Sequence, residues 1–259
     1  MIFLWTNSAD LNRARQFYTE NGYAIFSQVM PPDICDWVNE SYRKIADKDF
    51  APILNYDREN LDIQTVVMKN HIVVDIIEHL TGSAMVGCQT YFLFKEPGTR
   101  YAAQEFECHQ DNSYPRSEPG AYLAVDISLC DQDKESGGIC LWPGTHKLGL
   151  LPFEEKTGYR EKEGERPGNK VVLPDDVALA EYEGMTFAVV KNTPYRAVYN
   201  KIDATLNKGD ALIFDGDTIH ASYPNKSDHG RPAIITNYLR EGAEMIAGRT
   251  AKRMRIPLR

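Results

Sequence analysis

Two histidines and one aspartate in this 259-residue sequence have the types and spacing of a metal site. His109 and Asp111 lie two positions apart at the end of a β-like run, and strand alternation places both side chains on one face. His220 follows the short apolar run 211–214 much later in the chain. Two imidazoles and one carboxylate on one face of an octahedral ion suit non-haem Fe(II) and leave three positions open. A bidentate oxoacid and dioxygen would occupy those positions.

An arginine then enters an apolar strand, because Arg231 precedes the run Ala233 to Thr236. Burying a guanidinium is costly unless it meets an anion, and its planar fork matches a carboxylate. We therefore expect Arg231 to hold the far carboxylate of 2-oxoglutarate. A salt bridge to one of the 37 acidic residues is the alternative interpretation.

Composition narrows the possible partners and the location. A net charge of −8 argues against a nucleic-acid groove or an anionic membrane surface, since both reward clustered basic residues. No stretch approaches the roughly 20 apolar residues that span a bilayer. The five cysteines show no Cys-x-x-Cys spacing, which favours a reducing cytoplasm. We expect the basic C-terminal run to be solvated or to contact another subunit; its members are Arg249, Lys252, Arg253, Arg255 and Arg259.

The elements that must position these residues change character along the chain. The first third predicts helices at 8–21, 31–45 and 68–80, with a strand at 23–30 and with Ser8 capping the first helix. Short strands separated by turn residues follow, which favours a sandwich or barrel. They are expected at 85–94, 103–111, 122–129, 138–142, 187–190, 211–214 and 233–239. We expect one domain over residues 1–259, with a lid-like insertion at about 151–183.

Three blocks of the sequence together resemble a known family. The first block is His109-Gln110-Asp111 followed by Tyr114. The second runs from Glu135-Ser136-Gly137-Gly138 to Trp142-Pro143-Gly144-Thr145-His146-Lys147, and the third contains Gly209-Asp210, His220, Asn225 and Arg231. In order and spacing these blocks are similar to the phytanoyl-CoA dioxygenase-like branch of the Fe(II)/2-oxoglutarate oxygenases. The resemblance covers the chain from about Arg13 to Leu239.

The resemblance implies a mainly β fold, a double-stranded β-helix (jelly-roll, cupin-like) with flanking helices. It implies that His109, Asp111 and His220 bind Fe(II), and that Arg231 binds 2-oxoglutarate with help from Ser222. By analogy with the family, the oxoacid pocket is also expected to contain Gln89, Tyr91, Phe106 and Ser128.

Related halogenases replace the carboxylate ligand with a small residue, whereas Asp111 is present here. The resemblance therefore implies an O2-dependent hydroxylase that releases succinate and CO2. The expected substrate is a small metabolite of amino acid, aminophosphonate, acyl or natural-product type, and the chain is expected to be a monomer or homodimer.

Two other interpretations remain open. The same three ligands would serve a metal-dependent hydrolase or isomerase, although such an enzyme has no need for Arg231 as an oxoacid anchor. A non-catalytic jelly-roll binding protein is the second alternative. Asp215 and Asp217 are weaker candidate ligands than Asp111, and His146 is expected to pin a loop by hydrogen bonding.

Overall fold

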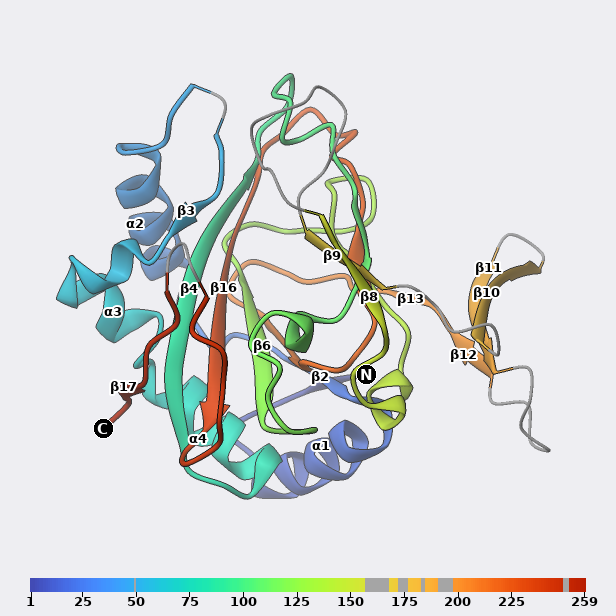
Figure 1. Ribbon diagram of the computed structural model, residues 1–259. Helices are drawn as coiled ribbons and strands as arrows, with labels where there is room; N and C mark the ends of the chain where they lie inside the picture. The colour runs from blue at the N-terminus through green and yellow to red at the C-terminus, as the bar shows by residue number, and fades with distance from the viewer. Residues whose placement is uncertain (49, 157–167, 172–176, 183–184, 191–197, 249–251) are drawn as a thin grey trace.

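Two sheets form the body of the protein in the computed structural model, which describes residues 1–48, 50–156, 168–171, 177–182, 185–190, 198–248 and 252–259. Both sheets are antiparallel apart from the parallel pair β1–β2 at one edge of the larger sheet. Figure 1 shows the large sheet, which has eight strands. Its order is β1 (Ile2–Phe3), β2 (Tyr23–Phe26), β14 (Ala211–Asp215), β6 (Tyr122–Ser128), β16 (Arg231–Arg240), β4 (Met85–Lys95) and β17 (Ile256–Pro257), and β3 (Ile53–Leu54) also pairs with β4. The small sheet has the order β13 (Ile202–Asp203), β7 (Ile139–Leu141), β15 (His220–Ser222) and β5 (Phe106–His109). The predicted mainly β jelly-roll is confirmed.

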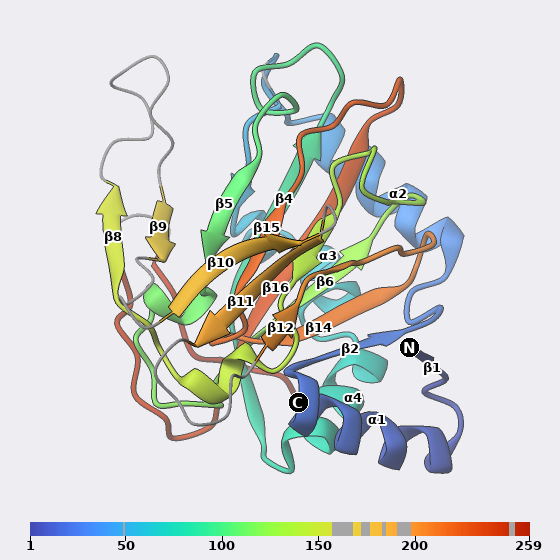
Figure 2. The same ribbon diagram turned by 90° about the vertical axis from the view of Figure 1, so that its right-hand side faces the viewer.

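Helices cover the outer face of the large sheet. α1 (Ser8–Asn21), α2 (Pro32–Arg43) and α4 (His71–Thr81) match the predicted helices closely, while α3 (Leu61–Val66) was not predicted. Figures 1 and 2 show all four helices on the side of the large sheet that faces away from the small one. A large apolar core that includes Phe92, Val125 and Ile234 fills the space between helices and sheet. The other face of the sheet is thereby left for the pocket.

Three local predictions need correction. The N-cap of α1 is Asn7, whose side chain accepts a hydrogen bond from the Ala9 N–H, and it is not Ser8. The strand expected at 103–111 is only β5, and Asp111 opens the 3-10 turn η2 (Asp111–Ser113) that follows it. The three-residue strand β15, which carries His220, was not predicted, since so short an element has no detectable alternation.

The predicted insertion at about 151–183 contains strands where the structure describes it. β8 (Phe153–Lys156) pairs with β9 (Gly168–Val171), and β9 lies against β5, as Figure 2 shows. β10 (Val177–Tyr182), β11 (Met185–Val190) and β12 (Val198–Asn200) form a further sheet to the side of the body in Figure 1. Residues 157–167, 172–176 and 183 of the predicted lid lie outside the described residues.

No helix in the described part of the chain is long and apolar enough to cross a membrane. All five cysteines are free thiols.

Candidate functional site

Three donor atoms converge on the inner side of the small sheet. His109 on β5 and His220 on β15 are directly opposed cross-strand partners. The Nε2 atoms of both histidines lie 3.6 Å from Oδ1 of Asp111, and the donor atoms of the three residues all lie within 4.8 Å of one another. Ligands about 2.1 Å from one ion would sit about 3 Å apart at right angles, so a small contraction would let all three bind a single metal.

The hydrogen bonds behind the imidazoles suit metal binding. Nδ1 of His109 lies 2.7 Å from the Glu107 carbonyl oxygen, and Nδ1 of His220 lies 3.0 Å from the Thr218 carbonyl oxygen. Each carbonyl accepts a hydrogen bond from the Nδ1–H group, which leaves the Nε2 lone pair facing the other ligands. Burial, together with the neighbouring His109, lowers the pKa of His220 to about 4, so its imidazole is neutral. The residues present therefore fit a divalent metal with imidazole and carboxylate ligands.

The turn that carries Asp111 is fixed by its neighbours. The buried Gln110 side chain donates to the carbonyls of Gly149 and Asp217 and accepts from the Leu151 N–H. Asn112 donates to the Asp217 carboxylate at 2.8 Å. Because these bonds join η2 to two other loops, the carboxylate of Asp111 is held in place beside the histidines.

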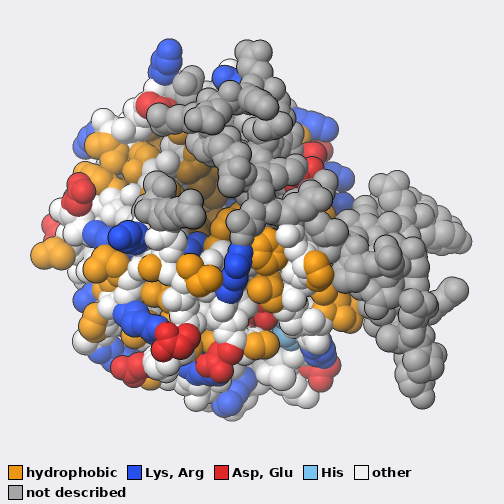
Figure 3. All heavy atoms as spheres, in the orientation of Figure 1, with side chains coloured by type: hydrophobic (Ala, Val, Ile, Leu, Met, Phe, Trp, Pro, Cys, Tyr) orange, Lys and Arg blue, Asp and Glu red, His pale blue; other side chains and the backbone are white. Residues whose placement is uncertain are grey.

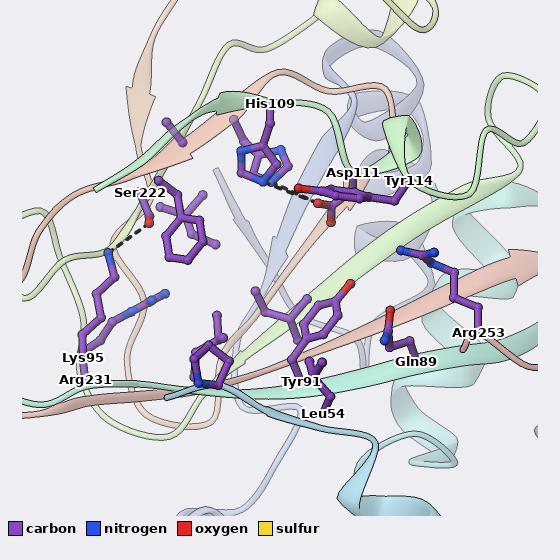
Figure 4. A pocket seen from close by; sticks show the side chains of 17 residues that line it. Leu54, Gln89, Tyr91, Lys95, His109, Asp111, Tyr114, Ser222, Arg231 and Arg253 are labelled. Carbon is purple, nitrogen blue, oxygen red and sulfur yellow. Dashed lines mark hydrogen bonds and ion pairs between the residues drawn. The ribbon is translucent and has the colours of Figure 1, made fainter. Parts of the chain in front are cut away.

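A cavity of about 340 Å³ separates the metal-binding residues from the large sheet. Alternate residues of β4 form its floor, because strand side chains alternate between faces; they are Gln89, Tyr91, Leu93 and Lys95. Figure 3 shows a recess on this face of the molecule with hydrophobic side chains inside it. Figure 4 shows His109 and Asp111 above the floor, with cationic side chains at both ends.

Arg231 and Lys95 define one end of the pocket, which we call the Arg231 end, together with Ser222. The two cations are direct cross-strand partners on β16 and β4, and each residue is only 1% exposed. Like charges in opposed positions destabilise a sheet unless something compensates them. Asp126 supplies part of the compensation, since its Oδ2 lies 3.2 Å from a terminal nitrogen of Arg231.

The Arg231–Asp126 pair is the salt bridge that the sequence left as an alternative, yet Arg231 also lines the cavity. Gln132 accepts a hydrogen bond from Nε of Arg231 and so fixes the guanidinium from behind. Burial raises the pKa of Asp126, and the charge of Arg231 opposes that rise. These two bonds use Nε and one terminal nitrogen of Arg231, so the other terminal nitrogen remains for a ligand in the cavity.

Lys95 is a functional candidate that the sequence analysis missed. Its amino group donates to Ser222 Oγ at 3.0 Å, to the Gln104 carbonyl at 3.3 Å and to the Tyr223 carbonyl. These bonds use the three N–H groups of the lysine. Because Ser222 accepts from Lys95, the hydroxyl proton of Ser222 is available for an acceptor in the cavity. The detectable signal was a cation at the end of an apolar strand, the same signal that identified Arg231.

Gly137, from the second sequence block, packs against this lysine. A Cβ at this position would lie 2.8 Å from Cδ of Lys95 and 3.0 Å from the Tyr223 carbonyl oxygen, and the backbone φ is +89°. Only glycine accommodates both the contact and the left-handed backbone without strain.

Arg253 lies at the opposite end of the pocket, the Arg253 end, with Gln89 and Tyr114 (Figure 4). This position overturns the expectation that the whole basic C-terminal run is solvated or contacts another subunit. Arg255 and Arg259 do lie at the surface, where they pair with Glu244 and with α4 respectively. The difference was not predictable because the run has no periodicity that singles out one member.

The remaining predicted residues divide into two groups. Ser222, Phe106, Tyr91 and Gln89 line the cavity, but Gln89 lies at the Arg253 end, away from Arg231, and so does not fit the predicted role as an oxoacid contact. Ser128 does not line the cavity, because its hydroxyl donates to the Cys130 carbonyl at 2.5 Å on a buried part of β6, and we withdraw it as an oxoacid contact. Asp215 and Asp217 lie outside the metal-binding group found among the described residues, and Nε2 of His146 lies 3.1 Å from the Thr19 carbonyl oxygen.

A jelly-roll with two histidines and one carboxylate between its sheets is the architecture of a mononuclear non-haem metal protein. The family model described as phytanoyl-CoA dioxygenase (PhyH) matches residues 18–233. The chain belongs to the phytanoyl-CoA dioxygenase family.

Individual relatives are distant. The peroxisomal phytanoyl-CoA dioxygenase of Bos taurus is 24% identical over 249 residues, which cover 86% of this chain and 67% of the relative. Phytanoyl-CoA dioxygenase 1 of Oryza sativa subsp. japonica is 26% identical over 160 residues, which cover 60% of this chain and 46% of the relative. The matched part thus spans between about half and two thirds of these relatives.

Solved structures share the fold. The epimerase SnoN from nogalamycin biosynthesis, in complex with Fe3+, alpha ketoglutarate and nogalamycin RO, superposes with a TM-score of 0.68 at 18% identity and covers 98% of this chain and 97% of its own. EvdO2 from Micromonospora carbonacea var. aurantiaca superposes with a TM-score of 0.69 at 16% identity and covers 92% of this chain and 94% of its own.

Proposed function

We propose that this chain is an Fe(II)- and 2-oxoglutarate-dependent dioxygenase that hydroxylates an unactivated C–H bond of a small metabolite. The observation that carries the proposal is the joint geometry of two sites in one cavity. Three convergent metal donors face it from the small sheet, and two opposed buried cations face it from the large sheet. A metal-dependent hydrolase has use for the first site but not for the second.

The residues divide the work by position. His109, Asp111 and His220 hold the metal, which with 2-oxoglutarate and O2 supplies the oxidising chemistry and leaves succinate and CO2 as co-products. Arg231 binds the far carboxylate of the oxoacid through the guanidinium that Asp126 and Gln132 orient. Ser222 donates a hydrogen bond from its hydroxyl group to the same carboxylate, because its oxygen already accepts a hydrogen bond from Lys95. The apolar walls exclude water from the reacting atoms.

Three further expectations remain part of this proposal. The substrate is a small molecule and not a nucleic acid, in keeping with the net charge of −8. The protein acts in the cytoplasm as a monomer or homodimer, and residues 1–259 form one domain. The insertion at about 151–183 serves as a lid over the side of the cavity, where β9 already lies against the strand that carries His109.

Anaerobic Fe(II) binding tests the metal assignment. We expect His109→Ala and Asp111→Ala to weaken Fe(II) binding by about 100-fold or more, since each removes one of three ligands. His146→Ala is the matched control, because it removes a half-buried imidazole that is hydrogen-bonded to Thr19. Equal Fe(II) affinity in the ligand variants and the control would reject the site. Succinate release during a substrate screen then tests the oxygenase activity, with the product mass showing whether one oxygen atom has been added.

A further inference from the structure

The cavity contains more positive charge than the oxoacid needs. Among the described residues that line it, the cations are Lys95, Arg231 and Arg253, and Asp111 is the one carboxylate. Asp126 offsets the charge of Arg231. A bound metal would balance the charge of Asp111, and the oxoacid carboxylate would add a negative charge at the Arg231 end. Arg253, at the other end, feels the charge of Asp111 across the cavity but forms no ion pair with any carboxylate of the described residues.

Arg253 is held in place by neutral groups. Its Nε lies 3.4 Å from the Tyr122 hydroxyl, and its guanidinium carbon lies 5.8 Å from the centre of the Tyr114 ring. No carboxylate of the described residues lies within salt-bridge distance of it, in contrast to Arg255, which lies 3.8 Å from Glu244. A half-buried guanidinium that faces a cavity without a carboxylate partner is a favourable site for an incoming anion.

Hydrogen bonds hold the backbone on both sides of Arg253 in place, so the position of its side chain is defined. The Arg253 N–H donates to the Ala247 carbonyl and the Met254 N–H donates to the Cys88 carbonyl. Ile256 then pairs with Gly87 on β4, which continues the large sheet. The segment therefore presents Arg253 beside the first floor residue, Gln89.

The two cationic ends are too far apart to serve one small oxoacid. Gln89 and Lys95 mark opposite ends of the floor, and six residues of strand span about 20 Å. The metal-binding residues lie between these ends in Figure 4. A ligand at the Arg253 end would therefore reach the metal-binding residues from the side opposite the oxoacid, which leaves this end for the molecule that is oxidised.

We propose that Arg253 is a specificity-determining residue that binds an oxyanion, a carboxylate or phosphoryl group, of the primary substrate. The inference rests on the proposed function, because it assigns the Arg231 end to 2-oxoglutarate. A cavity of about 340 Å³ that also holds the oxoacid limits the substrate to a small molecule. Arg253 lies outside the residues that the family model matches, 18–233, so the family motifs do not account for it.

The test is anaerobic calorimetry on Fe(II)-loaded protein saturated with 2-oxoglutarate, so that the Arg231 end is occupied. Three probes of similar size are titrated: benzoate, phenylphosphonate and neutral benzamide. We expect at least one anion to bind the wild-type protein at millimolar concentration and to bind at least fivefold more tightly than benzamide. Preference for benzoate identifies a carboxylate as the group recognised, and preference for phenylphosphonate identifies a phosphoryl group.

Two variants and one control complete the design. Arg253→Gln should weaken anion binding at least tenfold while leaving benzamide binding unchanged, and Arg253→Lys should restore most of the difference. Arg255→Gln is the matched control, since it removes a cation two residues away that faces solvent. A purely structural Arg253 would weaken all three probes alike or would lower only the melting temperature.

The outcomes are separable from failure of the proposed function. If the wild-type protein does not bind 2-oxoglutarate in the presence of Fe(II), the oxygenase assignment itself is contradicted. If 2-oxoglutarate binds normally, three results would overturn the substrate subsite alone. They are equal affinity for the anions and benzamide, no binding of either anion, and equal losses of anion binding in Arg253→Gln and Arg255→Gln.

Discussion

The two ends of the cavity hold arginines of the same chemistry in opposite settings. Arg231 is 1% exposed, stands on the long strand β16 and is paired with Asp126 and Gln132. Arg253 is half-buried, comes from the C-terminal segment and contacts the hydroxyl of Tyr122 and the ring of Tyr114. An invariant co-substrate is best served by a rigid, pre-oriented group, whereas a substrate that differs between relatives can be recognised by a residue outside the shared core. These settings support our proposal that the oxoacid binds at the Arg231 end and the substrate at the Arg253 end.

The largest effect should follow removal of the anchor at the Arg231 end. Arg231→Gln alone would leave Asp126 buried without its counter-charge, so we combine it with Asp126→Asn. We expect 2-oxoglutarate affinity to fall about 100-fold through loss of charged hydrogen bonds, measured by anaerobic calorimetry with Fe(II). Arg240→Gln, at the exposed far end of the same strand, controls for surface charge. An unchanged affinity in the double variant would show that the oxoacid does not bind at this end.

Replacement of Lys95 should have the next largest effect on 2-oxoglutarate binding. Lys95→Met keeps the length of the side chain but leaves three acceptors without a donor. We expect about 30-fold weaker 2-oxoglutarate binding and a lower free energy of unfolding by about 2–4 kcal/mol. Calorimetry and urea denaturation measure the two quantities separately. If stability fell while oxoacid affinity stayed at the wild-type value, Lys95 would be structural only.

Ser222→Ala should act more mildly. The variant removes one hydroxyl donor to the oxoacid and leaves the charges in place, so about fivefold weaker 2-oxoglutarate binding is expected. Binding of the anionic probe at the Arg253 end should be unchanged. A loss at the Arg253 end instead would mean that the two ligands have been assigned to the wrong ends.

Gly137→Ala should give the smallest effect on the oxoacid. The new methyl group would displace Lys95, and we expect about threefold weaker 2-oxoglutarate binding, with backbone strain on the order of 1–3 kcal/mol. Gly242→Ala is a matched control, because Gly242 also has a positive φ (+83°) but a methyl group there would meet no atom within 4 Å. Equal 2-oxoglutarate affinity in the two variants would show that the contact with Lys95 does not matter for the oxoacid.

The sequence predicted the functional residues unevenly, for physical reasons. His109, Asp111 and His220 were predictable because metal coordination demands particular side chains, even though η2 and β15 were not recognised as elements. Arg231 was predictable because a cation in an apolar strand requires a partner. Lys95 has the same setting at the end of the mostly apolar strand β4 and carries the same signal.

Contacts between distant segments could not be predicted from the sequence. Asp126 carries no local sign that it will meet Arg231, and it lies 105 positions away in the chain. Ser128 was predicted to line the pocket by analogy with the family. In the register that β6 adopts against β16, its hydroxyl instead donates a hydrogen bond to the Cys130 carbonyl. The position of Arg253 depends on the pairing of β17 with β4, and a two-residue strand is too short to be recognised from sequence. Tertiary pairing decides such positions.

The assignment of the two ends can be decided by the visible charge-transfer absorbance of the anaerobic Fe(II) protein during titration with 2-oxoglutarate. The absorbance is compared between the wild type, Arg253→Gln and the Arg231→Gln/Asp126→Asn variant. We predict that the wild type and Arg253→Gln develop the band at the same oxoacid concentration, and that the double variant requires about 100-fold more. A band that is lost in Arg253→Gln and retained in the double variant would contradict the assignment.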